Sequence, residues 1–300
     1  MSLFSLINRK GSTGFGYGST ALDVTAGLDL TGQTILVTGC NSGLGQEAMR
    51  VLALRGARVV AIARTEAKAK AALVKGASAL ACELSDPASI RACIATINAQ
   101  GIKLDAVIAN AGIMALPKLE LLHGYEAQFF TNHIGHFRLV TGLLDQLTDT
   151  GRVVMLSSSA HTMAPKGGIE FDNLDGNKGY RPWTAYGQSK IANLLFAKSL
   201  AARFAGTGRS AFAVHPGVIA TNLGRSMNPA IRLAFIPLSP LFMKTIAQGT
   251  ATEVFCAVHQ AAPALSGNYF ADVNVAECQA DANDPALARK LWDVSEKIIA

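Results

Sequence analysis

Short apolar segments of strand length alternate with segments of helical periodicity along most of the chain. The first runs from Thr34 to Thr38 into a glycine turn, and residues 46–54 then show a helical pattern. Six more strand-like segments follow at 57–63, 79–82, 106–109, 152–156, 211–214 and 267–270. Strands that are separated by helices need right-handed crossovers, which place the helices on both faces of a parallel sheet. The pattern therefore predicts an α/β, doubly wound, mainly parallel sheet of about seven strands.

Hydrophobic content is high, but it is not concentrated as a membrane span would require. Half of the 300 residues are hydrophobic, yet no run approaches the roughly 20 apolar residues that cross a bilayer. The apolar stretch from Ile231 to Met243 is interrupted by Arg232, Pro237 and Pro240. The N-terminus shows no long apolar region with a cleavage site, since Met1 to Ile7 is too short. We expect a cytoplasmic protein without stable membrane insertion.

Charge and cysteine content argue against a nucleic-acid-binding protein and against a protein stabilised by disulfides or zinc. The net charge of +6 comes from 27 basic and 21 acidic residues, and the basic residues are dispersed except on the probable helix around Lys68, Lys70 and Lys75. A solvated face explains that cluster better than nucleic-acid binding. The five cysteines are scattered without C-x-x-C spacing, which favours neither a disulfide framework nor a zinc site. We therefore expect no nucleic-acid partner and no metal.

Three glycines follow the first strand and open the first helix. Gly39, Gly43 and Gly45 have no Cβ, so the backbone can turn sharply and approach a pyrophosphate at the helix N-terminus. Their spacing, G-x-x-x-G-x-G, differs from the common dinucleotide pattern G-x-G-x-x-G. A second cluster, from Gly14 to Gly18, has no strand before it, and we interpret it as a flexible N-terminal loop. Strand, glycine loop and helix in this order indicate a Rossmann-like fold.

Tyr186 and Lys190 are four residues apart, so a helix would place them on one face. A tyrosine has a pKa near 10, and acid–base work near pH 7 requires a shift of roughly 3 units. A neighbouring lysine and a cationic nicotinamide could together stabilise the phenolate. The alternative is an ordinary helical pair, because Y-x-x-x-K alone is common.

Taken together, these motifs carry a resemblance to a known family. Thr38 to Gly45, Asn110-Ala111-Gly112 and Tyr186 to Lys190 resemble the short-chain dehydrogenase/reductase superfamily in order and spacing. Asn132 to Phe137 and His215 to Thr221 narrow the resemblance to the branch of retinol dehydrogenases, the WW-domain oxidoreductase and related chloroplast-envelope proteins, although this chain has no WW domain. The resemblance covers residues 20–300.

The resemblance implies four catalytic residues. Tyr186 passes the proton to or from the substrate oxygen, and Ser158 hydrogen-bonds that oxygen. Lys190 binds the nicotinamide ribose and lowers the tyrosine pKa. Asn132 supports a water relay through a backbone distortion near Lys190, or it is a structural amide within its helix. Ser158 and Tyr186 are separated by an insert, 162–180, that resembles the extension of the retinol-dehydrogenase branch.

The resemblance also implies the residues that bind the cofactor. They are Gly39, Asn41, Ser42, Gly43, Leu44, Gly45, Arg64, Glu83, Leu84, Asn110, Ala111, Gly112, Tyr186, Lys190, Pro216, Gly217, Ile219 and Thr221. At the end of the second strand, where NAD enzymes often have a carboxylate, Ala63 is followed by Arg64. Because a guanidinium can bind the extra phosphate of NADP, we expect NADP(H) to be preferred, with NAD(H) as the alternative. A solvated loop arginine is the other interpretation of Arg64.

We therefore expect an N-terminal extension, 1–30, and a single dinucleotide-binding and catalytic domain, 31–300, with a substrate lid around 223–243. The alternative for the lid is a surface helix and loop packed on the core. The expected reaction is hydride transfer between NADP(H) and a small lipophilic alcohol, aldehyde or ketone of retinoid, steroid or xenobiotic type. An NADP(H)-binding redox sensor or scaffold without significant turnover is the main alternative. A module that binds membrane surfaces is a third.

The assembly of the chain is the last expectation from the sequence. The resemblance implies a homodimer or homotetramer, because relatives often pair through the helix that carries Lys190 and the helix before it. Apolar residues on the Lys190 helix could serve either such an interface or the core of one chain; they are Ile191, Leu194, Leu195 and Ala197.

Overall fold

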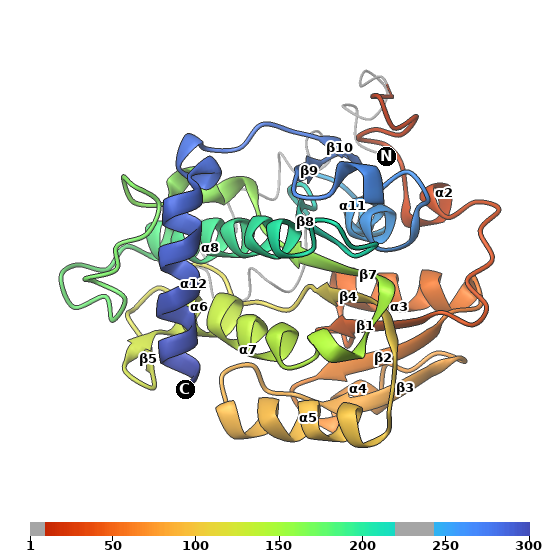
Figure 1. Ribbon diagram of the computed structural model, residues 1–300, viewed down its shortest axis with the longest axis horizontal. Coiled ribbons are helices and arrows are strands. Elements are labelled where there is room, and N and C mark those ends of the chain that lie inside the picture. Colours follow the sequence, from red (N-terminus) through yellow and green to blue (C-terminus); the bar gives the residue numbers. More distant parts are fainter. Residues whose placement is uncertain (1–9, 220–242) are drawn as a thin grey trace.

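The centre of the described structure is an eight-stranded sheet with the strand order β10-β9-β8-β7-β4-β1-β2-β3 (Figure 1). We describe it from a computed structural model, in which residues 10–219 and 243–300 are placed. Thr221 and residues 223–242 of the expected lid lie outside these described residues.

Seven of the strands run parallel and correspond to the seven predicted segments. They are β1 (Thr34–Thr38), β2 (Arg58–Ala63), β3 (Ala77–Ala81), β4 (Leu104–Ala109), β7 (Leu147–Leu156), β8 (Ser210–His215) and β9 (Tyr269–Ala271). The eighth, β10 (Asn274–Val275), pairs antiparallel with β9, and a separate hairpin joins β5 (Leu121–Leu122) to β6 (Tyr125–Glu126). These two-residue strands are too short to show alternation, so the sequence did not predict them. The predicted Rossmann-like α/β fold is confirmed.

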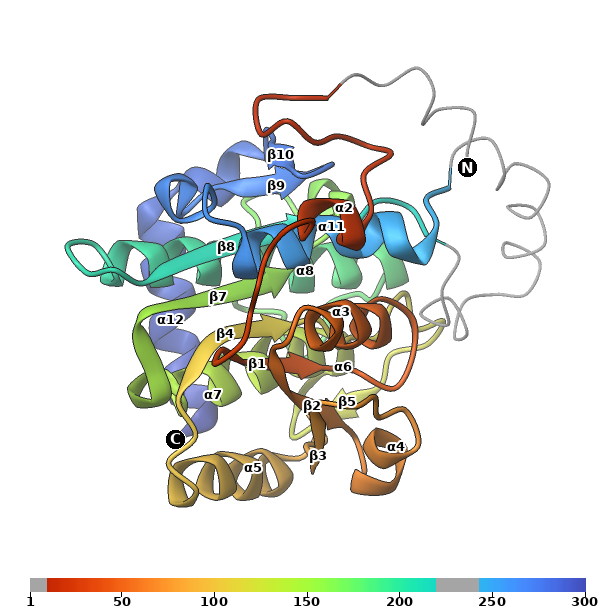
Figure 2. The same cartoon turned by 90° about the vertical axis from the view of Figure 1, so that its right-hand side faces the viewer.

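Helices cover both faces of the sheet (Figure 2). One face carries α2 (Ala21–Val24), α3 (Gly43–Leu54) and α11 (Ile246–Val258), and the other carries α5 (Pro87–Ala99), α7 (Gly135–Thr141), α8 (Pro182–Arg203) and α12 (Pro285–Ile299). Shorter elements complete the described chain: α4 (Glu66–Lys70), α6 (Ala127–Phe129), the π-helix η1 (Phe130–Ile134), and the 3-10 turns η2 (Leu144–Gln146), η3 (Ser159–Met163), η5 (Pro263–Leu265) and η6 (Ala280–Asn283). Among the described helices, none combines the length and the apolar character needed to cross a membrane.

Strand β1 shows how the two faces are filled. Its residues alternate between the two hydrophobic clusters, with Ile35 and Val37 on the side of α3 and α11 and Leu36 on the side of α5 and α7. All three are fully buried. A strand that buries both faces reads as a continuous apolar run rather than an alternating one, which is why this segment could be recognised from the sequence.

The C-terminal helix α12 lies across α8 (Figure 1). Its Trp292 ring lies 5.0 Å from the ring of Phe137 on α7 and 5.6 Å from that of Phe196 on α8, measured between centroids. The guanidinium of Arg203 stacks on the same indole at 3.7 Å. The four apolar residues of α8 that could have formed an interface, Ile191, Leu194, Leu195 and Ala197, are buried within this chain. They belong to its core.

The glycine-rich stretch near the N-terminus is packed, in contrast to the flexible loop that we expected. Phe15 packs edge-on against the stacked rings of Phe255, on α11, and His259, its C-cap, at 5.9 and 5.6 Å between centroids. The amide of Asn274, on β10, donates a hydrogen bond to the carbonyl of Phe15 at 3.0 Å. These partners are more than 200 residues away in the sequence, so a local pattern could not reveal them.

The order of the strands determines where a ligand can bind. The chain leaves β1 towards β2 on one side and returns through β4 on the other, so the loops after β1 and β4 diverge at neighbouring strand ends. In open α/β sheets this divergence creates a crevice at the carboxyl ends of the strands. Gly39 to Ser42 follow β1 and Asn110 to Gly112 follow β4, so both predicted motifs lie at this crevice.

Candidate active site

The glycine loop turns directly from β1 into α3. Gly39 and Gly43 have φ angles of +73° and +59°, which residues other than glycine rarely adopt. Gly45 is needed for a different reason, because a Cβ there would lie 2.5 Å from the carbonyl oxygen of Gly39 and 2.6 Å from the amide of Asn110. Ser42, the N-cap of α3, makes no capping hydrogen bond through its side chain. The loop therefore presents a helix N-terminus suited to an anionic group.

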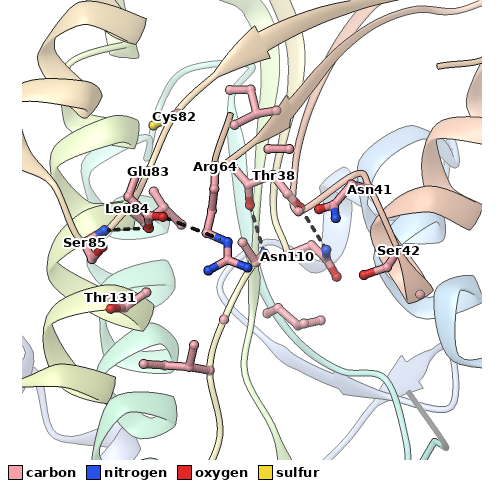
Figure 3. Close-up of a pocket in the computed structure, with 18 of the residues that line it drawn as sticks. Thr38, Asn41, Ser42, Arg64, Cys82, Glu83, Leu84, Ser85, Asn110 and Thr131 are labelled. Carbon is pink, nitrogen blue, oxygen red and sulfur yellow. Dashed lines mark hydrogen bonds and ion pairs between the residues drawn. The ribbon is translucent and has the colours of Figure 1, made fainter. Parts of the chain in front are cut away.

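Thr38 joins the two loops at the crevice (Figure 3). Its hydroxyl accepts a hydrogen bond from the backbone N–H of Ala111 at 2.9 Å, and its carbonyl accepts one from the amide of Asn110 at 2.8 Å. The same hydroxyl lies 3.0 Å from Nε2 of His136, whose Nδ1 lies 2.9 Å from the carbonyl of Asn132. Because that carbonyl can only accept, Nδ1 carries the proton and Nε2 accepts from Thr38. Burial lowers the pKa of His136 to about 4, which agrees with a neutral ring.

A cavity of about 530 Å³ lies along this crevice. Eleven of the predicted cofactor residues line it: Gly39, Asn41, Ser42, Gly43, Leu44, Arg64, Glu83, Leu84, Asn110, Ala111 and Gly112. Gly45 is not in the lining. Tyr186, Lys190, Pro216, Gly217 and Ile219 do not line this cavity. The cavity therefore corresponds to the part of the expected site nearest β1, β2 and β4.

Arg64 and Glu83 lie side by side in the lining of this cavity, after the neighbouring strands β2 and β3 (Figure 3). The guanidinium Nε of Arg64 lies 4.0 Å from a carboxylate oxygen of Glu83, and the two side chains are 54% and 30% exposed. A pair this exposed contributes little to stability. The carboxylate also accepts a hydrogen bond from the backbone N–H of Ser85 at 3.3 Å. Arg64 thus stays at the end of β2 with its guanidinium accessible from the cavity.

Tyr186 and Lys190 lie one turn apart on α8, which begins at Pro182. Both side chains are buried, and the Lys190 ammonium is 5.5 Å from the centre of the tyrosine ring. Burial raises the pKa of Tyr186 to about 12, although a hydrogen bond to Ser158 acts in the opposite direction. Burial also lowers the pKa of Lys190 to about 7. In the protein without cofactor, desolvation of the Tyr186 hydroxyl therefore outweighs the hydrogen bond to Ser158.

Ser158 follows the end of β7 and is the N-cap of η3. Its hydroxyl accepts a hydrogen bond from the backbone N–H of Ala160 at 3.1 Å and also bonds Tyr186. The neighbouring Leu156 carbonyl accepts from the Lys190 ammonium at 2.9 Å and from the amide of Asn193 at 3.1 Å. The end of β7 therefore holds the three residues in one cluster, in which Tyr186 and Lys190 are buried and Ser158 is half-buried.

Asn132 lies within the π-helix η1, a distortion of the kind that the resemblance implied. Its side-chain oxygen accepts from the backbone N–H of Ile113 at 2.8 Å, and its amide nitrogen donates to the Ile113 carbonyl and to the Ser189 hydroxyl, both at 2.9 Å. Ser189 in turn donates to the carbonyl of Tyr186 at 2.7 Å. Asn132 thus connects the loop after β4 to the helix that carries Tyr186, so its amide has a structural role whether or not it also supports a relay.

Pro216, Gly217 and Ile219 follow β8 at the same edge of the sheet. Gly217 has a φ of +95°, and a Cβ there would lie 2.7 Å from the side chain of Lys244. The carbonyl of Val218 accepts a hydrogen bond from the backbone N–H of Lys244 at 2.9 Å. This contact fixes the loop beyond β8.

Several contributors to the site could not be recognised from the sequence. The motif comparison did not single out Thr38, Ser189, Asn193 or the Leu156 carbonyl as site members. Thr38 lies within the glycine-loop motif and Ser189 lies between Tyr186 and Lys190. Their positions within these motifs were the only signal in the sequence that they belong to the site. A backbone carbonyl leaves no signal in the sequence.

The fold and the site together define a class. A doubly wound sheet with a glycine loop at its switch point, and a half-buried serine with a buried tyrosine and lysine beside it, is the arrangement of a dinucleotide-dependent oxidoreductase. A family model for short chain dehydrogenases matches residues 33–232. The chain belongs to the short-chain dehydrogenase/reductase family, and it is an NAD(P)-dependent oxidoreductase acting on CH–OH groups.

Similar proteins place it near the retinol dehydrogenases within this family. Retinol dehydrogenase 12 of Mus musculus is 39% identical, over 92% of this chain and 89% of its own length. Retinol dehydrogenase 11 of Homo sapiens is 37% identical, over 90% and 87%. Short-chain dehydrogenase TIC 32 B, chloroplastic, of Brassica napus is 38% identical, over 100% of this chain and 99% of its own length.

Solved structures agree on the fold. An uncharacterized protein from Mycobacterium Paratuberculosis superposes with a TM-score of 0.75 at 33% identity, covering 94% of this chain and 97% of that one. A short chain dehydrogenase from Burkholderia cenocepacia J2315 in complex with NADP superposes with a TM-score of 0.62 at 21% identity, covering 80% and 96%. At that identity the second likeness supports the fold alone.

Proposed function

We propose that the protein transfers a hydride between NADP(H) and a lipophilic alcohol, aldehyde or ketone, with Tyr186 as the acid or base. The observation that carries this proposal is the cluster of Ser158, Tyr186 and Lys190 at the end of β7. There the Ser158 hydroxyl bonds Tyr186, and Lys190 lies one helical turn away, next to the crevice formed by the glycine loop.

The residues of the crevice fit a dinucleotide. The uncapped N-terminus of α3 would hold the pyrophosphate, and Gly45 leaves no room for a Cβ where the loops meet. Glu83 and Leu84 would contact the adenine, and Asn110 to Gly112 the adenosine and ribose. Pro216, Gly217, Ile219 and Thr221 would hold the nicotinamide end. NADP(H), when bound, supplies the hydride chemistry.

Arg64 supports the preference for NADP(H). It stands directly after β2 and lines the cavity beside Glu83, with about half of its side chain exposed. A guanidinium at this place can form charge-assisted hydrogen bonds with a ribose phosphate. The Glu83 carboxylate draws the guanidinium towards the adenosine side, so the arginine is partly oriented before a ligand arrives.

The protein side chains perform the proton transfer. In reduction, Tyr186 donates its proton to the substrate oxygen while Ser158 hydrogen-bonds that oxygen. The raised pKa of Tyr186, about 12, keeps the phenol protonated and ready for this direction. The charged form of Lys190, whose pKa is about 7, then stabilises the phenolate that remains. In oxidation the same groups act in reverse, and Asn132 supports the path of the proton towards solvent.

Two observations support a lipophilic substrate: the composition of one segment and the names of two relatives. The 223–243 segment is rich in apolar residues, including Leu233, Phe235 and Phe242. Two of the relatives carry the name retinol dehydrogenase, and retinol is a lipophilic alcohol. Retinoid, steroid and xenobiotic carbonyl compounds are all members of the proposed class. We also propose that the enzyme is cytoplasmic. We propose as well that it forms a homodimer or homotetramer, and light scattering of the purified protein would test this oligomeric state.

The proposal is tested by following NADPH and NADH oxidation side by side over a panel of lipophilic aldehydes and ketones. We expect turnover with NADPH to exceed turnover with NADH. Arg64→Gln should weaken NADPH binding about tenfold or more and leave NADH binding within about twofold, since a hydrogen bond to a charged group contributes about 1.5–3 kcal/mol. Arg58→Gln, at the first residue of β2 and outside the cavity lining, is the matched control. Tight binding of NADPH without turnover of any compound would favour a redox sensor or scaffold.

A further inference from the structure

His161 lies buried between the serine of the site and the C-terminal part of the chain. It belongs to η3, and 2% of its surface is exposed. Its Nδ1 lies 2.6 Å from the carbonyl oxygen of Ser158, and its Nε2 lies 3.1 Å from the backbone nitrogen of Gln279. The ring also packs edge-on against Tyr269 at 5.0 Å between centroids. One side chain thus bridges two segments that are more than 100 residues apart.

These two contacts determine the protonation of the ring. A backbone N–H only donates, so Nε2 must offer its lone pair to Gln279. A backbone carbonyl only accepts, so Nδ1 must carry the proton that bonds Ser158. Both bonds form together only in the neutral imidazole with its hydrogen on Nδ1. Burial lowers the pKa of His161 and therefore favours this neutral state.

A second histidine holds the other side of the same backbone. Nδ1 of His215, at the end of β8, accepts a hydrogen bond from the backbone N–H of Ser159 at 3.1 Å. Burial lowers the pKa of His215 to about 4, so this ring is neutral as well. The peptide between Ser158 and Ser159 is therefore held by His161 at its carbonyl and by His215 at its N–H.

We propose that His161 is a positioning residue for Ser158. The Nδ1–H bond fixes the Ser158 carbonyl, and the Nε2 bond anchors the ring to Gln279, so the Ser158 hydroxyl stays directed towards Tyr186. This rests on the proposed function, in which the Ser158 hydroxyl bonds the substrate oxygen. The proposed role differs from that of Ser158 itself, because His161 acts only through the backbone that it holds.

The backbone changes conformation at Ser158. Ser158 has φ −164° and ψ 157°, whereas the next residues form the tight turn η3, so the chain changes from extended to helical at the serine. The direction of the hydroxyl depends on this change. A displacement of about 1 Å at a reacting group can cost about 100-fold in rate. Fixing the carbonyl limits that displacement.

Two amide substitutions separate the two hydrogen bonds. In His161→Asn, the amide nitrogen takes the place of Nδ1 and can still donate to Ser158, but the acceptor for Gln279 is lost. In His161→Gln, the amide takes the place of Nε2 and can still accept from Gln279, but the bond to Ser158 is lost. We expect the Asn variant to keep kcat within about threefold and the Gln variant to lose about tenfold or more, and a tenfold loss is about 1.4 kcal/mol in the barrier.

The dissociation constant for NADPH and the thermal midpoint separate positioning from folding. Both variants should bind NADPH as the wild type does, and their thermal midpoints should fall by similar amounts, because each loses one hydrogen bond. A Gln variant with the kcat of the wild type would overturn the proposal. Equal losses of kcat in both variants would also overturn it, because His161 would then serve the fold alone.

The tautomer is measured independently of turnover. The ¹⁵N chemical shifts of the His161 ring near pH 7 should show a protonated Nδ1 and a bare Nε2, and a proton on Nε2 or a charged ring would overturn the proposal. If the wild type turned over none of the panel, the proposed function would fail. The ring shifts would then still decide whether His161 holds the Ser158 carbonyl.

Discussion

The Lys190 ammonium lies 5.5 Å from the centre of the Tyr186 ring, and it donates a hydrogen bond to the Leu156 carbonyl at 2.9 Å. The lysine is thus held by the end of β7 beside the Tyr186 ring. Because the site is buried, each of these two residues has its pKa shifted towards the neutral form. Near pH 7 the phenol is therefore neutral and the lysine is charged only in part.

Lys190 should make the stability of the protein depend on pH. Its pKa is about 7 in the folded protein against an ordinary 10.5, so between these values the unfolded chain binds the proton and the folded chain does not. The free energy of unfolding should therefore rise with pH in this window. Relative to Lys190→Met, the wild type should gain about 2 kcal/mol between pH 7 and pH 9, measured by urea unfolding. A pH-independent difference between the two proteins would contradict the low lysine pKa.

Gly45→Ala should damage the cofactor site through sterics alone. The added Cβ would lie 2.5 Å from the Gly39 carbonyl, a backbone atom that cannot move without displacing the loop. We expect a loss of about 1–3 kcal/mol in stability and a large loss of NADPH affinity, measured by fluorescence titration.

Gly101→Ala is the control for Gly45→Ala. Gly101 has a φ of +61°, and no atom lies within 4 Å of the added Cβ, so the substitution costs only about 1–2 kcal/mol of backbone strain. Its NADPH affinity should remain that of the wild type. Equal affinity in both variants would show that the tight contact at Gly45 does not shape the site.

Much of the fold was predictable because its signals are local. The apolar runs of the seven parallel strands and the glycines at 39, 43 and 45 show their structure within a few residues. The contacts of Phe15 with α11 were not predictable, because they join distant segments. The two-residue strands were not predicted because two residues are too few to show an alternating pattern.

The sequence predicted which residues form the site better than it predicted their pKa values and hydrogen bonds. The motifs indicated Ser158, Tyr186 and Lys190, and the structure brings these residues together at the end of β7. The motifs could not show that desolvation raises the tyrosine pKa, because burial depends on the whole fold. They also could not show that Asn132 uses its amide to hold Ile113 and Ser189.

Trp292 should carry much of the attachment of α12 to the domain. Its indole contacts Phe137, Phe196 and Arg203. Trp292→Ala should lower the free energy of unfolding by about 3–5 kcal/mol. Trp292→Phe, which keeps an aromatic ring among these partners, should cost clearly less. Chemical denaturation of the three proteins decides this, and equal stability of the Ala variant and the wild type would show that α12 contributes little to the core.

The central claim, that Tyr186 transfers the proton, is tested most directly by comparing wild type and Tyr186→Phe in single-turnover reduction with saturating NADPH and a substrate that the wild type accepts. The substitution removes only the hydroxyl, so the dissociation constant for NADPH should stay within about twofold. The rate of the chemical step should fall by about 10²–10⁴-fold, the usual contribution of general acid–base catalysis. A Phe variant that binds NADPH equally well and reduces the substrate at the wild-type rate would contradict the account.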